Sequence, residues 1–279
     1  MRKQQCACAV TLVLGLFTAS SSAQQNVTRY VRYALKGTMS YGILEGENIR
    51  PVTGNIFEDP EPASTTVRLA DVRLMTPCQP SKVIAVGLNY KSNLGDKAPA
   101  AYPGLFAKLT SSIVGPEDLI LLPLDAKNPH YGGELVIVIG RRGKNITLAE
   151  APRYIFGVTA GNDVSERDWE QSDLQWFRAR SSDTFGPVGP VIARGLNYDN
   201  LLVQTRINGE VRQSERTSNL VFNTSAIISY ISKYVTLQPG DLIFTGTPGE
   251  TKAIKPGDVV EVEVEGVGVL RNKAVRVHN

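Results

Sequence analysis

Carboxylates carry most of the chemistry that this sequence could perform. The chain has only two histidines, His130 and His278, so a site with several histidine ligands or a histidine-activated nucleophile has one candidate at most. Glu134 stands at the entrance of an apolar run, and Asp163 ends another. Carboxylate and water oxygens are the ligands that hard cations such as magnesium, manganese or calcium prefer. A metal site in this chain would therefore select an ion of that kind.

The spacing around Glu134 raises a specific question. Residues two apart in an extended strand share a face at about 6.6 Å between Cα atoms, so acidic side chains at 132 and 134 could bind one ion together. Position 132 is a glycine. His130 shares that face but lies about 13 Å from Glu134 in an extended chain, too far to replace the missing carboxylate. Glu134 is therefore either a charge that starts a strand or half of a metal site.

Asp163 also has two interpretations. It follows a strand-like segment, 155–162, and precedes a helix start, and functional side chains collect at the carboxyl ends of strands. On spacing alone, a turn or capping role is commoner for an aspartate than a metal role. Ser165 and Asp168 have the Ser-X-X-Asp spacing of a capping box, which predicts a structural role for Asp168.

Short strands are expected to position these residues. Apolar or alternating segments that predict strands lie at 30–35, 40–44, 49–52, 82–90, 134–140, 155–163 and 259–270. Residues 57–67 are polar and contain prolines, as in a linker or surface loop. Segment 224–235 has Ile227, Ile228 and Ile231 at helical spacing, which predicts an amphipathic helix laid on a sheet.

The alternation in 259–270 places valines and glutamates on opposite faces, so that the row Glu261, Glu263 and Glu265 is predicted to be solvated. Strands outnumber helices, and neither a regular βα alternation nor a nucleotide-binding loop is present. Rossmann and P-loop architectures are therefore excluded.

The composition is that of an ordinary globular protein, with 279 residues, 42% hydrophobic and 20% charged. A formal net charge of +3 without a lysine or arginine run gives no support to nucleic acid or an anionic membrane as a partner.

The first residues have the layout of a secretory signal peptide. Arg2 and Lys3 precede an apolar stretch, 6–19, that is shorter than the roughly 20 residues of a membrane span. Small residues follow, which predicts a signal over residues 1–23, cleavage near Ala23, and export to the periplasm or the extracellular space. Cys78 is then the only cysteine left, so no intrachain disulfide is expected, and a lone cysteine is more often a small buried hydrophobe than a nucleophile.

A series of blocks between Lys82 and Lys273 stands in a particular order. They are VGLNYKSNLGD, LFAKLTSSIVGP, HYGGELVIVIGRR, FGVTAGNDVSERDW, SSDTFGPVGP, NGEVRQ, TSNLVF, LQPGDLIFTGTPG and KPGDVVEVEVEGVGVLRN. Together they resemble the fumarylacetoacetate hydrolase superfamily, in its fumarylacetoacetase C-terminal-like domain. The resemblance implies an α+β, strand-rich fold: a mixed β-roll over residues 80–279, with a small N-terminal β cap and linker over 24–79. It also implies a homodimer.

The resemblance implies an enzyme that acts on small 2-oxo or β-dicarbonyl acids with a bound divalent cation. Hydrolysis of carbon–carbon bonds, decarboxylation and tautomerisation in this family pass through an enolate that the cation stabilises. The family's Glu-X-Glu pair and aspartate are matched here by Gly132, Glu134 and Asp163, so Glu134 and Asp163 are the implied ligands of weakly bound Mg²⁺ or Mn²⁺, with Ca²⁺ as an alternative.

The other site residues are also carried over position by position. Asn93 and Asp96 stand where the family commonly has a His-X-X-Glu dyad that activates water, and Arg180 stands where it has a lysine; these are the expected catalytic positions. The expected substrate-binding residues are Tyr90, Lys108, Arg167, Glu170 and Thr247, which is the second threonine of the TGTPG block.

Two functions remain open at this point. An asparagine at 93 cannot accept a proton at neutral pH, so decarboxylation or tautomerisation is favoured over hydrolysis. The changes at positions 93 and 132 also fit a catalytically inactive family member that acts as a ligand-binding or structural homodimer.

Overall fold

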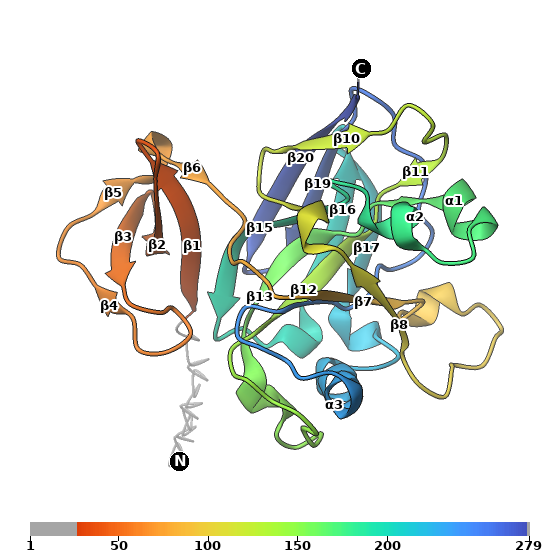
Figure 1. Ribbon diagram of the computed structural model, residues 1–279, viewed down its shortest axis with the longest axis horizontal. Coiled ribbons are helices and arrows are strands. Elements are labelled where there is room, and N and C mark those ends of the chain that lie inside the picture. Colours follow the sequence, from red (N-terminus) through yellow and green to blue (C-terminus); the bar gives the residue numbers. More distant parts are fainter. Residues whose placement is uncertain (1–26, 278–279) are drawn as a thin grey trace, which may run out of the picture.

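The computed structural model describes residues 27–277, and the predicted signal segment lies outside this range. Most regular elements are strands (Figure 1), in agreement with the expected strand-rich fold. The largest sheet has thirteen strands. Its main path, in spatial order, runs through β4 (Glu61–Pro62), β3 (Asn48–Thr53), β2 (Thr38–Glu45), β1 (Thr28–Leu35), β15 (Gly186–Arg194), β13 (Ile155–Asn162), β12 (Gly133–Ile139), β18 (Leu242–Phe244), β7 (Val83–Gly87) and β8 (Gly104–Lys108).

Three short strands join this sheet off the main path: β5 (Val67–Arg68), β6 (Arg73–Leu74) and β9 (Ile113–Val114). A five-stranded sheet contains β10 (Leu119–Leu122), β20 (Gly268–Arg276), β19 (Val259–Val264), β16 (Leu202–Ile207) and β17 (Glu210–Arg216), and a two-stranded sheet pairs β11 (Pro129–His130) with β14 (Ser165–Glu166). The α-helices are α1 (Arg167–Ser172), α2 (Phe177–Ser181) and α3 (Thr224–Tyr234).

The N-terminal strands form where the alternating sequence predicted them. They lie at one side of the molecule (Figure 1), yet they are part of the large sheet, because β1 pairs with β15 in antiparallel register. The cap is therefore hydrogen-bonded to the main domain through its own backbone.

The centre of the large sheet is the rigid base of the fold. All seven residues of β12 are buried, and β12 pairs with β13 on one side and with β18 on the other. The run of leucine, valine and isoleucine explains this position, since branched apolar side chains suit a strand that is covered on both faces. The predicted helix forms as α3, and its buried isoleucines pack with Ile137 and Ile139.

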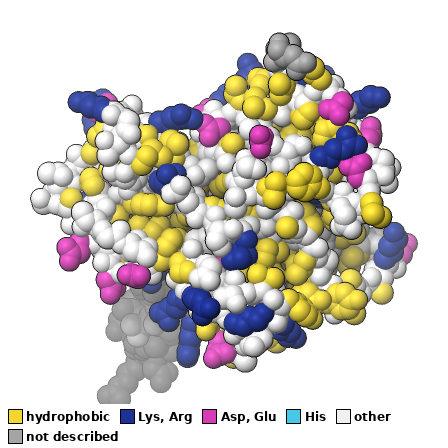
Figure 2. Space-filling view, viewed as in Figure 1, with side chains coloured by type: hydrophobic (Ala, Val, Ile, Leu, Met, Phe, Trp, Pro, Cys, Tyr) yellow, Lys and Arg dark blue, Asp and Glu magenta, His cyan; other side chains and the backbone are white. Residues whose placement is uncertain are grey.

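The alternation in the second sheet is also confirmed. Val260, Val262 and Val264 are buried, whereas Glu261 and Glu263 remain partly exposed and form ion pairs with Arg206. On the face shown in Figure 2, acidic and basic side chains are scattered among apolar ones. Within residues 27–277, no helix has the length and apolar character to cross a membrane.

The predicted capping box is wrong. Helix α1 begins at Arg167, and the capping side chain belongs to Glu166, whose Oε2 accepts the backbone N–H of Trp169 at 2.7 Å. Its other oxygen accepts the N–H of Asn128. Ser165 instead donates its hydroxyl to the carbonyl of Asp163. Both oxygens of Glu166 thus accept backbone N–H groups and support the start of α1.

Candidate functional site

The strand pairing brings the candidate residues to one end of the large sheet. Glu134 is the second residue of β12 and Asp163 follows β13, and the antiparallel register that pairs Gly133 with Asn162 places them side by side. The segment after β18 reaches the same end, because β18 runs antiparallel to β12. Strand β7 runs parallel to β18, so the segment that carries Asn93 arrives there too.

A cleft of about 310 Å³ opens at this end of the sheet. Five charged side chains line it, namely Glu134, Asp163, Arg167, Glu170 and Arg180. Asn93, Thr247 and Thr251 add polar groups. A cleft near the lower limit of ligand pockets, with convergent charges, suits a small and strongly polar molecule.

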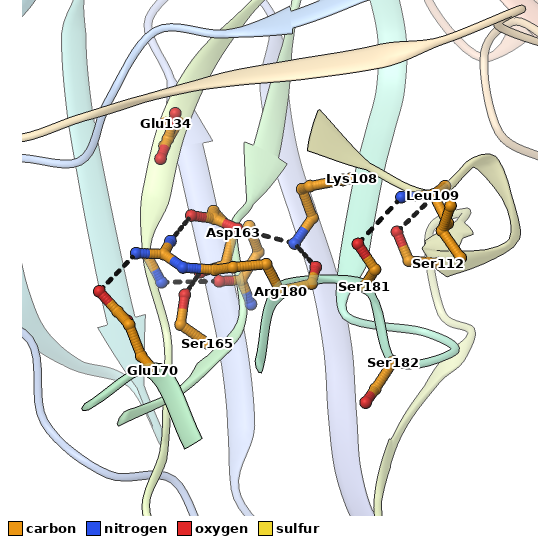
Figure 3. A network of polar contacts seen from close by, with 12 residues as sticks. Lys108, Leu109, Ser112, Glu134, Asp163, Ser165, Glu170, Arg180, Ser181 and Ser182 are labelled. Atoms are coloured by element: carbon orange, nitrogen blue, oxygen red, sulfur yellow. Dashed lines mark hydrogen bonds and ion pairs between the residues drawn. The ribbon is translucent and has the colours of Figure 1, made fainter. Parts of the chain in front are cut away.

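An ion-pair network forms the floor of the cleft (Figure 3). The Lys108 ammonium lies 2.7 Å from Oδ1 of Asp163 and also donates to the Arg180 carbonyl. The Arg180 guanidinium contacts Oδ2 of Asp163 and, through Nη2, lies 3.0 Å from Oε1 of Glu170. Arg167 holds the other oxygen of Glu170 at 2.6 Å. Three cationic groups thus share two carboxylates.

Glu134 is held differently. It is 2% exposed, and its Oε2 accepts the backbone N–H of Gly246 at 2.6 Å. Among the residues that the structure describes, Glu134 forms no ion pair within 4.0 Å. Burial raises the pKa of its carboxyl group well above the usual range, and the negative charge of Asp163 adds to this effect against the opposing Gly246 N–H and Arg180. This environment therefore favours the protonated form of Glu134 more than solvent would.

Asp163 shows the opposite electrostatics. Burial alone would raise the pKa of its carboxyl group, but the Lys108 ammonium and the Arg180 guanidinium outweigh burial and hold that pKa below the usual range. Burial lowers the pKa of Lys108, with Asp163 opposing. Two neighbouring carboxyl groups with pKa values shifted in opposite directions are typical of sites that separate proton transfer from charge stabilisation.

The implied metal site does not fit this arrangement. Both oxygens of Asp163 are taken by cations, and position 132 has no side chain. Within residues 27–277, no group of three or more His, Cys, Asp or Glu side chains is arranged to hold an ion. Glu134 and Asp163 lie together as expected, but their role as ligands stays a prediction.

Gly132 is closely packed in this backbone. A Cβ atom at this position would stand 2.9 Å from the carbonyl oxygen of Asp163, nearer than real Cβ contacts allow. The Gly132 N–H donates to the side chain of Asn162, and its carbonyl accepts from the Asp163 N–H. The absence of a carboxylate at position 132 and the close approach of the Gly132 and Asp163 backbones therefore belong together, because a side chain at 132 would not fit.

The expected water-activating dyad is not assembled. Asn93 lies at the cleft, but its side chain accepts the Tyr90 N–H and donates to the Gly249 carbonyl at 2.7 Å. Asp96 is exposed and is not among the residues that line the cleft. Asn93 thus supports the local backbone, and the geometry gives Asp96 no contact with the site.

The expected substrate-binding residues divide into two groups. Arg167, Glu170 and Thr247 line the cleft. Lys108 is fully buried beneath Asp163, and Tyr90 is also fully buried, with a hydroxyl that finds no hydrogen-bond partner among the described residues. Lys108 can therefore act on a ligand only through Asp163 and Arg180.

Sequence reasoning missed Thr251 and the role of His130. The Thr251 hydroxyl is 3.3 Å from Nη2 of Arg167 and 2.8 Å from Nδ1 of His130, and the other ring nitrogen of His130 contacts Asn128. Burial, together with the charge of Arg167, lowers the pKa of His130. The His130 imidazole thus supports Thr251 and Arg167 at the edge of the cleft.

Comparison with known proteins agrees with the resemblance. The family "Fumarylacetoacetate (FAA) hydrolase C-terminal" matches residues 82–275, and "Rv2993c-like, N-terminal" matches residues 28–77. Protein Rv2993c of Mycobacterium tuberculosis is 42% identical over 260 residues, which cover 89% of this chain and 98% of that protein. The human mitochondrial oxaloacetate tautomerase FAHD2A is 34% identical over 277 residues, covering 94% of this chain and 87% of its own.

Solved structures give the same result. The crystal structure of 2-hydroxyhepta-2,4-diene-1,7-dioate isomerase from Mycobacterium marinum is 41% identical, with a TM-score of 0.85, and covers 90% of this chain and 100% of its own. Maleylpyruvate hydrolase from Sphingobium sp. SYK-6, in complex with manganese(II) and pyruvate, is 26% identical, with a TM-score of 0.76 and the same coverage.

The prediction of export is wrong. The similar proteins whose names state a location are mitochondrial oxaloacetate tautomerases, from rat, cattle and human, and no similar protein described above is named as secreted. The apolar N-terminal pattern that suggested a signal peptide is too general to outweigh this relationship.

Proposed function

Because this chain belongs to the fumarylacetoacetate hydrolase superfamily, we propose that it is an enzyme that interconverts the keto and enol forms, or the double-bond isomers, of a small 2-oxo dicarboxylic acid. The observation that carries the proposal is that Glu134 lines the same small cleft as Arg167 and Arg180. Glu134 is buried and forms no ion pair in the described chain. Similar proteins named as oxaloacetate tautomerases and as an isomerase support the same class of reaction.

The residues suit proton transfer next to a carbonyl group. Arg167 and Arg180 attract the carboxylate and oxo oxygens of the substrate. The Glu134 carboxylate removes a proton from the carbon beside the oxo group, and the protonated Glu134 then returns this proton to the enolate oxygen to give the enol. The reverse sequence returns the keto form, so no atom is gained or lost.

Hydrolysis is less well supported. It needs a base that activates water, and the Asn93 side chain at the expected position is an amide that is bonded to backbone groups. Tautomerisation needs no attacking water and depends only on proton transfer and charge stabilisation.

A divalent cation is the family expectation, and one similar protein was crystallised with manganese. Since the carboxylates of this chain do not fit such an ion, no step of the proposed reaction is assigned to it. A homodimer also remains a proposal.

The second candidate is a catalytically inactive member that binds a small acid. The change at Gly132 and the backbone bonds of Asn93 favour it. It predicts ligand binding without turnover.

The test is an ultraviolet assay of freshly dissolved enol oxaloacetate with the full chain. We expect the enol band to decay faster than it does in buffer, while liquid chromatography of an acylpyruvate shows no release of pyruvate. Equal decay with and without protein, for oxaloacetate and for unsaturated 2-hydroxy dicarboxylates, would leave the inactive alternative as the better account.

A further inference from the structure

We propose that the Arg180 guanidinium, rather than a divalent cation, binds the oxo and carboxylate oxygens of the ligand, so that the cleft takes up planar 2-oxo acids without a metal ion. The inference rests on the proposed function only for the ligand class. It adds a metal-independent mode of binding and names the residue that provides it.

The position of Arg180 is the first observation. Its side chain is 7% exposed and lies among the cleft residues, between Asp163 and Glu170, with Glu134 nearby (Figure 3). Its guanidinium therefore bridges two carboxylates of the cleft, Asp163 and Glu170.

The donors of Arg180 are the second observation. A guanidinium has five N–H groups, and the described residues take one from Nη1 for Asp163 and one from Nη2 for Glu170. The Nε–H is buried without a hydrogen-bond partner among the described residues. The second N–H of Nη1 and the second N–H of Nη2 are not used by the described residues either, and a ligand oxygen that accepts from them gains charge-assisted hydrogen bonds.

The plane of the guanidinium is fixed by aromatic contacts. Its central carbon lies 4.3 Å from the ring centroid of Phe106 and 5.4 Å from that of Trp176. A guanidinium held in one plane is preorganised for the two oxygens of a planar oxo acid or enolate.

The charge balance of the site is the third observation. The ion pairs of the cleft join two carboxylates, Asp163 and Glu170, to three cationic side chains: Lys108, Arg167 and Arg180. A site that bound a divalent cation through its carboxylates would have to break the pairs of Asp163. An anionic ligand can instead accept hydrogen bonds from the unused N–H groups of the arginines, and the ion pairs of Asp163 then stay intact.

The experiment is a calorimetric titration of oxalate, a planar dianion that resembles an enolate, into the full chain in the presence of EDTA. The titration is repeated with Mn²⁺ in place of EDTA. We expect oxalate to bind in both buffers, with dissociation constants within about threefold of each other, and we expect no heat from Mn²⁺ alone.

Arg180→Gln should weaken oxalate binding in EDTA by at least tenfold, whereas Arg178→Gln should leave it unchanged. Arg178 lies on the same helix but pairs with Asp173 outside the cleft, so it is the matched control. Arg180→Lys keeps the charge without the planar fork and should give an intermediate affinity, and a thermal melt of each variant separates lost binding from lost folding.

The inference is overturned if oxalate binds only with Mn²⁺, if it binds in neither buffer, or if folded Arg180→Gln binds as well as the unmodified chain. Oxaloacetate turnover by the same samples keeps the two proposals apart. Turnover that requires Mn²⁺ refutes the inference and leaves the proposed function intact. Metal-free oxalate binding without turnover of oxaloacetate or of unsaturated 2-hydroxy dicarboxylates refutes the proposed function and leaves the binding mode intact.

Discussion

The two sides of the cleft are built from different kinds of contact. On one side, Asp163, which follows β13, pairs with Arg180 of α2, and Arg180 also pairs with Glu170 of α1. On the other side, Asn93 is tied to backbone groups, and the segment that follows it carries Asp96 on the surface. The first side can bind and polarise an anion, whereas the second has no group that can activate water. The contrast therefore favours the proposed proton transfer over hydrolysis.

The largest effect is expected from Glu134→Gln. The change removes the proposed proton acceptor but keeps an oxygen for the Gly246 N–H, so tautomerase activity should fall by about 10² to 10⁴-fold. Thermal unfolding should show no loss of stability, because the substitution removes a buried carboxyl group without an ion pair in the described chain. Glu117→Gln, at an exposed glutamate far from the cleft, should change neither property. Activity retained by Glu134→Gln would transfer the proton-transfer role to another group.

A large loss of stability is expected from Lys108→Met. The substitution removes the fully buried ammonium and leaves Asp163 with Arg180 as its remaining partner, so the free energy of unfolding should fall by about 3 kcal/mol. Arg68→Met breaks an exposed pair with Asp71 and should cost less than about 1 kcal/mol. Urea denaturation of both variants checks the difference, and equal losses would contradict the view that the buried network stabilises this side of the cleft.

The pH dependence of activity and of stability tests the role of Glu134. As a base, Glu134 must lose its proton, and burial raises its pKa, so activity should rise with pH through a value above the ordinary glutamate range. Stability should change in the opposite direction to activity. Because the folded-state pKa of Glu134 is raised, this group contributes stability at low pH, and the contribution is lost as the pH rises through that pKa. Rate profiles and thermal melts across pH would show both trends. A profile with its midpoint in the ordinary glutamate range would contradict the assignment.

The Gly132→Glu variant tests whether a carboxylate can be restored at position 132. The new Cβ would meet the Asp163 carbonyl at 2.9 Å, so we expect a loss of about 1 to 3 kcal/mol in unfolding free energy and no gain of Mn²⁺ binding. Gly104→Glu is the control, because a Cβ there comes no nearer than 3.8 Å to another atom. Tight Mn²⁺ binding by Gly132→Glu would show that the ion pairs of Asp163 give way to a metal.

The sequence predicts the parts of this molecule that depend on local pattern. The apolar run of β12, the helical spacing of α3 and the alternation of β19 each determine an element and its buried face. The pattern also put Glu134 at the start of one strand segment and Asp163 at the end of another, but only the family resemblance implied that the two lie together.

The contacts that decide the chemistry are not local. The cap of α1 comes from Glu166 because Asn128, 38 positions earlier, also needs an acceptor, and Arg180 meets Asp163 from a helix 17 positions away. Motif matching placed Lys108 and Tyr90 among the substrate contacts, but their burial depends on how distant segments pack. Thr251 carried no signal of its own beyond lying just after the TGTPG block.

The smallest effect is expected from Asn93→His, which directly tests the comparison of the two sides. The imidazole cannot make both backbone bonds of the asparagine, so stability should fall by about 1 kcal/mol, while tautomerase activity stays within about threefold. Hydrolysis of an acylpyruvate should remain undetectable, because Asp96 lies on the surface and cannot orient the new imidazole. The measurement is pyruvate release by the variant beside the unmodified chain. Hydrolysis gained by this one substitution would show that the second side of the cleft has lost only its base and is otherwise intact.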